Sequence, residues 1–117
     1  MKKDENRQLE VKFYRSPGGK EPLREMIKEF SREIQKIIGE DIRAVQKTWP
    51  LVGLPLVKKI EKNMWEIRTH IPNGIVRVFF TIKYEHIVLL HGFIKKTQKT
   101  PMQELKIAQN RLKELQE

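Results

Sequence analysis

The sequence contains no cysteine, which excludes a disulfide framework and any thiolate metal site. It also lacks an apolar run long enough to span a membrane, and its first residues, MKKDENRQ, lack the apolar segment of a signal peptide. No repeat or low-complexity segment interrupts the 117 residues. We therefore expect a soluble cytoplasmic protein with a flexible segment at 1–8 and a single domain at 9–117, large enough to bury a core.

Acidic residues are comparatively few. The 24 lysines and arginines exceed the 15 aspartates and glutamates, which gives a formal net charge of +9. On a domain of this size the excess favours a polyanionic partner, nucleic acid first and an acidic protein second. Scattered lysines that only keep the protein soluble are the alternative interpretation of the same composition.

The stretch from Met64 to Thr100 predicts two successive hairpins and three neighbouring strands. Asn73-Gly74, between two runs of β-type residues, is a strong hairpin signal. A two-residue turn there places His70 opposite Arg77 and Arg68 opposite Phe79. The second turn lies within residues 83–86, with its length left open, and the last strand covers 87–93.

Side chains alternate across a strand, so this hairpin has two unlike faces. The first face is almost entirely apolar and should pack under helices: Trp65, Ile67, Thr69, Ile71, Val76, Val78, Phe80 and Ile82. The second face gathers charge: Glu66, Arg68, His70, Arg77, Phe79 and Thr81. A concentration of guanidinium and imidazole groups on one sheet face is the feature that points to function.

The remaining segments complete a small α+β domain. A first strand is expected at 9–14, a helix from Pro22 to Gly39, a shorter helix at 40–49, a packed connection at 50–57 and a final helix after Thr100-Pro101. Residues 58–62 either begin the hairpin region or lie beside it. The expected architecture is a mainly antiparallel sheet, with two N-terminal helices on one face, a C-terminal helix, and the other face free for binding.

The segments W-E-I-R, N-G-I-V-R-V-F-F and H-G-F-I-K-K-T-Q-K-T-P, in this order of elements, resemble the HigB branch of the RelE/ParE toxin superfamily, including its phage-derived members. The resemblance spans roughly Leu9 to Leu115. It implies a RelE-like fold and a toxin that cuts mRNA in the ribosomal A site of the 30S subunit. It also implies a cognate helix-turn-helix antitoxin as partner, and no cofactor.

The resemblance also assigns site residues. It implies Arg77 as the phosphate-stabilising arginine, Arg68 as the basic residue on the preceding strand, and Lys95 and Lys96 as the basic pair after the last strand. The sequence departs from RelE at Glu66, where RelE has a lysine, and at Met102, near RelE's late tyrosine. His70 or His91 can take the place of that tyrosine.

Metal-independent RNA cleavage needs a base for the ribose 2′-OH, cations for the phosphorane and an acid for the 5′-oxygen. Arginines suit the phosphate oxygens, and neighbouring cations depress a lysine pKa, so we expect Lys95 or Lys96 to be the base or a charge stabiliser. We expect either His70 or His91 to be the acid. Further RNA contacts are expected from Lys58, Lys59, His70 and Lys99.

Each of these residues also has a structural interpretation. Arg77 can be a solvated cross-strand residue, Arg68 can pair with Glu66, and His91 can be a satisfied core histidine. The three histidines with few nearby carboxylates make a weak metal-ligand set. Two other functions stay open beside the nuclease: a ParE-like module that inhibits DNA gyrase, and an inactive prophage relative.

Overall fold

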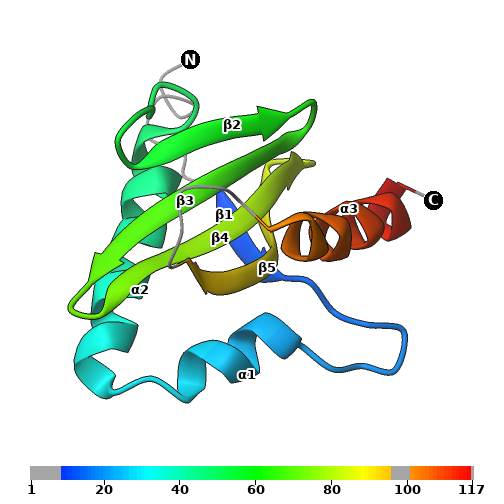
Figure 1. Cartoon of the computed structure of the whole chain (residues 1–117). Helices are drawn as coiled ribbons and strands as arrows, with labels where there is room; N and C mark the ends of the chain where they lie inside the picture. Colours follow the sequence, from blue (N-terminus) through cyan, green and yellow to red (C-terminus); the bar gives the residue numbers. More distant parts are fainter. Residues whose placement is uncertain (1–8, 96–100, 117) are drawn as a thin grey trace.

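The computed structural model describes residues 9–95 and 101–116 (Figure 1). Its elements in chain order are β1 (Glu10–Phe13), α1 (Pro22–Lys28), α2 (Arg32–Thr48), β2 (Val57–Glu61), β3 (Met64–Ile71), β4 (Gly74–Lys83), β5 (His86–Lys95) and α3 (Met102–Gln116). None of the helices in these two ranges is both long and apolar enough to cross a membrane. The predicted α+β class is confirmed.

Five strands form one sheet in the order β1-β5-β4-β3-β2. All neighbours are antiparallel except β1 and β5, which run parallel. The β2 strand settles the open question about residues 58–62, because it pairs with β3 and forms a sheet edge. The expected sheet of four strands therefore gains a fifth.

The predicted register of the first hairpin was wrong by two residues. Ile71 pairs with Gly74, and Arg68 lies directly opposite Arg77, so the turn consists of Pro72 and Asn73. A type I′ turn at Asn73-Gly74 would need positive φ at both residues, and only Gly74 has it (φ +149°). A shift of two residues keeps every side chain on its face, so the division into two faces was correct.

The first face packs under α1 and α2, as expected. Its buried core comprises Leu23, Ile38, Val45, Val57, Ile67, Val76, Val78, Phe80, Ile87 and Leu89. The rings of Trp49 and Trp65 meet edge to face with centroids 4.8 Å apart, and Trp65 stacks on Phe80. Trp65 is therefore half-buried and packs against the core, on the side that its sequence context favoured.

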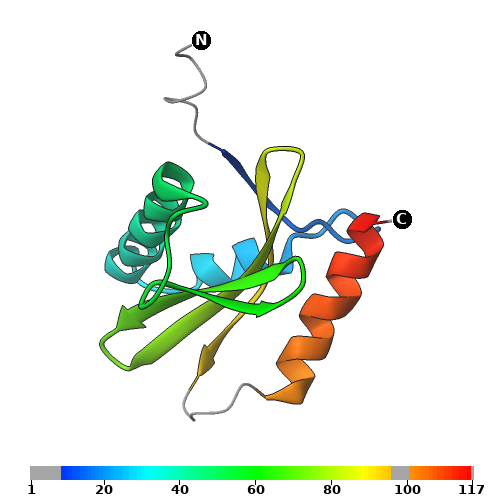
Figure 2. The ribbon, with the colours of Figure 1, turned by 90° about the horizontal axis from the view of Figure 1, so that it is seen from above.

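The second face is not free along its whole length, contrary to expectation. The α3 helix packs on it in a second cluster: Met64, Phe79, Val88, Leu90, Phe93, Ala108 and Leu112, with Leu105 and Leu115 half-buried. Figure 2 shows α2 and α3 on opposite sides of the sheet. A register shift between Phe79 and Phe80 marks a bulge at Leu90, which places Leu90 and His91 on the same face of the sheet, both towards α3.

The predicted helix from Pro22 to Gly39 is in fact two helices. The α1 helix ends at Lys28, and the Ser31 hydroxyl caps α2 by accepting a hydrogen bond from the Ile34 amide at 3.3 Å. Gly39 lies inside α2 rather than after a helix end. Serine is a strong N-cap, and its side chain stabilises a new helix start where apolar periodicity alone predicts continuation.

Candidate functional site

Four basic side chains gather on the second face around one carboxylate. They come from four neighbouring strands: Lys58 on β2, Arg68 on β3, Arg77 on β4 and Lys95 on β5. Lys58 lies opposite Glu66, and Arg68 lies opposite Arg77. We call Lys58, Arg68, Arg77, Lys95 and Glu66 the basic cluster. It lies beyond the end of the α3 cluster, where Phe93 is the cross-strand partner of Arg77.

The centre of the basic cluster is a buried ion pair. Arg77 donates from Nη1 to Glu66 Oε1 at 2.8 Å, and the side chains are 8% and 1% exposed. The sequence allowed a pair between Glu66 and Arg68, but the partner is Arg77. Since a buried carboxylate without a cation is strongly unfavourable, Arg77 supplies the partner that Glu66 needs at this position.

Three polar atoms of the basic cluster are buried with no partner in the described part of the chain. They are Glu66 Oε2, Arg68 Nε and Arg77 Nε. Two are donors and one is an acceptor, and all three belong to charged side chains. Buried polar atoms are almost always satisfied, so these three atoms lack the hydrogen bonds that would fully stabilise the charged side chains of the basic cluster.

Lys95 has the environment of a proton-transfer group. It is 8% exposed, and burial together with the nearby Arg77 lowers the pKa of its amine. Lys58 and Arg68 act in the same direction, whereas Glu66 opposes them by raising this pKa. A lysine with a lowered pKa supplies more neutral amine near neutral pH, which is the form that accepts a proton.

The structure does not bring all the predicted residues into the basic cluster. Lys59 follows Lys58 but points to the first face, where its ammonium lies 5.9 Å from the centroid of the Trp65 ring. His70 is exposed on β3, two residues from Arg68. The predicted residues Lys96 and Lys99 lie outside the described ranges.

His91 lies on the second face but bonds to α3. Its Nε2 is 2.5 Å from Glu104 Oε1, and the imidazole is 14% exposed. Burial lowers the pKa of His91, although the hydrogen bond to Glu104 opposes that shift. Its contacts resemble the satisfied histidine that the sequence kept as an alternative. His70 is the more accessible of the two histidines.

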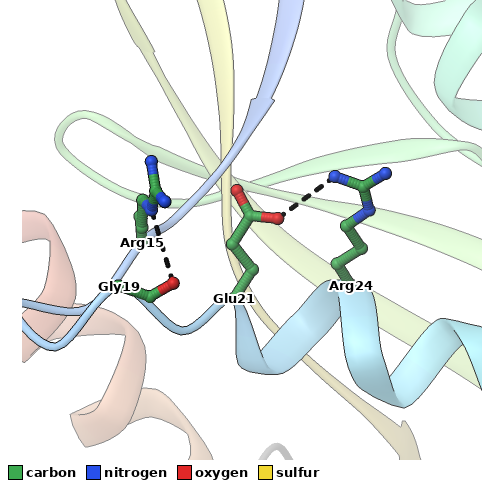
Figure 3. Close-up of polar contacts among 4 residues, drawn as sticks. All are labelled: Arg15, Gly19, Glu21 and Arg24. Carbon is green, nitrogen blue, oxygen red and sulfur yellow. Dashed lines mark hydrogen bonds and ion pairs between the residues drawn. The ribbon is translucent and has the colours of Figure 1, made fainter.

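A second basic surface lies at the start of α1 (Figure 3). Arg15, Arg24 and Lys28 line a depression of about 490 Å³ together with Glu21 and Glu25. Arg24 is 3.2 Å from Glu21, and Arg15 donates to the Gly19 carbonyl at 3.4 Å. These contacts are exposed and both signs of charge are mixed, so this surface is a solvated one rather than a cationic site.

Within the ranges 9–95 and 101–116, no group of three histidine, aspartate or glutamate side chains is arranged to hold a metal ion. The sequence predicted the sheet face on which these four cations meet. The catalytic roles predicted for Arg68, Arg77 and Lys95, and the RNA contact predicted for Lys58, stay predictions. Sequence analysis missed the burial of Glu66 and its pairing with Arg77. The presence of a carboxylate on a face rich in arginine was the signal that pointed to a buried pair.

Comparison with protein-family models supports a phage-derived, toxin-like family but does not single out the HigB branch. The model of the family described as "Phage derived protein Gp49-like" matches residues 25–113, which include α2, the strands β2 to β5 and most of α3. No curated protein matches the chain. The match covers well over half of the sequence and all of the basic cluster, so the chain belongs to the phage-derived Gp49-like family, a toxin-like family related to RelE and HigB.

Proposed function

We propose that this protein is the toxin of a type II toxin–antitoxin system and an endoribonuclease that cuts mRNA on the ribosome. The observation that carries the proposal is Lys95, a largely buried residue whose amine has its pKa lowered by burial and by Arg77, within a cluster of basic side chains. RNA cleavage without a metal needs this combination of a proton acceptor and fixed cations. The formal charge of +9 favours the same polyanionic substrate.

In this mechanism the neutral amine of Lys95 takes the proton of the ribose 2′-OH. The 2′-oxygen attacks phosphorus, the bond from phosphorus to the 5′-oxygen breaks, and the products are a 2′,3′-cyclic phosphate and a 5′-OH. Arg68 and the exposed Lys58 bind the phosphate oxygens. His70 gives a proton to the 5′-oxygen, because His91 is held by Glu104.

Arg77 contributes through charge in this proposal. Its guanidinium is 8% exposed and pairs with Glu66, so it lies beneath the surface on which RNA would rest. Its positive charge lowers the pKa of Lys95, and its Nε has no partner in the described chain. The phosphate-stabilising role implied by the resemblance then passes in part to Arg68, which lies opposite Arg77.

A cognate helix-turn-helix antitoxin completes the proposal. An antitoxin that contacts Lys58, Arg68 and His70 would cover the same face that binds RNA and would block the substrate. Its contacting segment should carry carboxylates, because the exposed part of the face is basic. A gene for such a protein next to this one would support the pairing.

Primer extension on messages after brief induction tests the activity, with purified ribosomes and a defined mRNA as the cell-free version. The wild type should give discrete in-frame cuts. Lys95→Arg keeps the charge but loses the proton acceptor, so cleavage should fall on the order of 100-fold or more. Discrete cuts of wild-type strength from Lys95→Arg would overturn the assignment of the base.

Lys58 and Lys59 offer a matched pair of variants. Both are exposed and adjacent in sequence, but only Lys58 lies on the face of the basic cluster. Lys58→Ala should weaken cleavage several-fold, whereas Lys59→Ala should leave it near the wild-type level. Equal losses from both would indicate a general charge effect instead of a site on one face.

The buried pair supports a second candidate, an RNA- or protein-binding module without nuclease activity. Glu66 neutralises Arg77 within a site that depends on positive charge. DNA damage with intact messages after induction would favour gyrase inhibition, as in ParE-like proteins. If induction causes neither mRNA cuts nor DNA damage while the protein still binds its antitoxin, the result would favour an inactive prophage relative.

A further inference from the structure

A depression beside the basic cluster has the lining of a nucleobase pocket. It has a volume of about 310 Å³ and lies between α2, the segment before β2 and the outer half of β3. Its lining consists of Ile37, Asp41, Pro55, Leu56, Arg68 and His70. The volume is at the lower end of the range of about 300–1,000 Å³ in which small ligands bind.

The open edge of β3 creates this depression. The pairing of β2 with β3 stops at Val57 and Ile67, and the Arg68 amide then bonds to the Leu56 carbonyl at 2.8 Å. Beyond that point β3 has no strand neighbour on this side in the described chain. Side chains of α2 and of β3 can therefore face a common space at the sheet edge.

Arg68 joins the depression to the basic cluster. It lines the depression, and its charge also acts on Lys95. Its Nε is buried with no partner among the described residues. A nucleotide whose phosphate meets the basic cluster would therefore place its own base, or that of a neighbour, within reach of the depression.

The flat guanidinium of Arg68 and the ring of His70 suit the faces of a base. Proteins that read single-stranded RNA stack bases on such groups and hydrogen-bond to their Watson–Crick edges. Ile37, Pro55 and Leu56 supply the apolar walls. A second phosphate is a poor occupant, because the Asp41 carboxylate would repel it.

Asp41 is the group that can distinguish one base from another. Its carboxylate has no hydrogen-bond or salt-bridge partner in the part of the chain that the structure describes. Neither Arg68 nor His70 bonds to it, although both line the same depression. An ionised carboxylate only accepts hydrogen bonds. Guanine alone presents two adjacent donors, N1–H and the N2 amino group, on its Watson–Crick edge.

We propose that the depression lined by Asp41, Arg68 and His70 is a guanine-binding subsite, with Asp41 as the specificity-determining residue. This proposal rests on the proposed function, since it names the base that the RNA-binding face reads. Guanine gains two hydrogen bonds to Asp41. Adenine and cytosine can donate only from one amino group, and uracil only from N3–H.

The test uses mononucleotides and the folded, full-length protein, so it needs neither the ribosome nor cleavage. Amide NMR spectra are recorded during titration with GMP, IMP, AMP and UMP. IMP keeps N1–H but lacks the N2 amino group, so it isolates one hydrogen bond. GMP should bind about tenfold more tightly than IMP, as expected for one bond to a charged acceptor, and should shift the amides of Ile37, Asp41 and Leu56.

Asp41→Asn should bring the GMP to IMP ratio close to one, because an amide cannot accept two donors side by side. Glu40→Gln is the matched control, since it removes the same charge from the neighbouring exposed position of α2. It should leave the ratio unchanged. A thermal melt establishes that both variants fold.

Equal binding of the four nucleotides, or a GMP preference that survives Asp41→Asn, would overturn the subsite. The absence of mononucleotide-induced shifts at the depression would also overturn it. These results would not refute the proposed nuclease activity, which primer extension tests separately. Guanine-selective binding without any cleavage would instead support the subsite and refute the nuclease.

Discussion

Removal of one member of the Glu66–Arg77 pair should destabilise the fold far more than removal of both. The side chains are 1% and 8% exposed, so a single replacement leaves a charge in the interior without its partner. Breaking a buried pair in this way costs about 3–5 kcal/mol, and replacing both members by apolar residues of similar volume is neutral or stabilises by up to about 4 kcal/mol. The unsatisfied Glu66 Oε2 and Arg77 Nε already weaken the pair, which favours the double variant further.

Urea unfolding of Glu66→Leu, Arg77→Met and the double variant measures this. With an m value of about 2 kcal/mol/M, a loss of about 4 kcal/mol moves the midpoint down by about 2 M. The double variant should return to or above the wild-type midpoint. Its coupling energy follows from the double-mutant cycle.

The exposed pair of Arg24 and Glu21 is the control. Its side chains are 54% and 29% exposed, so Arg24→Met should change stability by no more than about 1 kcal/mol. If Arg77→Met cost as little as Arg24→Met, Arg77 would be well solvated and the reasoning about a buried pair would be wrong. The result also decides how activity data on Arg77 variants are interpreted, since an unfolded variant says nothing about catalysis.

Four further predictions follow from single residues. Burial lowers the pKa of His91, so the unfolded chain binds more protons at this residue than the folded chain does. The free energy of unfolding should therefore fall as the pH drops below about 6.5. His91→Gln should flatten this pH dependence in urea titrations, and a pH dependence equal to that of the wild type would contradict the prediction. Glu66 raises the pKa of Lys95, so Glu66→Gln should lower it further, and an upward shift of the Lys95 titration followed by NMR would count against the cluster geometry. Gly39 lies inside α2 with open space around an added Cβ, so Gly39→Ala should stabilise by about 0.5–1 kcal/mol. At Gly92 the added Cβ would lie 2.6 Å from Leu23 Cδ1, so Gly92→Ala should destabilise by about 1–3 kcal/mol, and thermal melts that reverse this order would refute the packing argument.

Local patterns were enough to predict most of the elements. Alternation in β3 and β4 sorted their side chains correctly between two faces, and the buried side of α3 consists of the apolar residues Leu105, Ala108, Leu112 and Leu115, which recur at helical spacing. The boundaries at Gly39 and at Asn73-Gly74 were wrong. The cap at Ser31 starts a new helix before Gly39, and Asn73 lacks the positive φ that a type I′ turn at Asn73-Gly74 would need.

The sequence by itself determined the fold class, the excess of positive charge and the sheet face on which Arg68 and Arg77 lie, because alternation and composition are local properties. Tertiary structure decided which charges meet. The pairing of Glu66 with Arg77, the separation of Lys59 from Lys58 and the placement of Asp41 near Arg68 depend on strand register and on helix packing. These relations join residues far apart in the chain, and no spacing along the sequence encodes them.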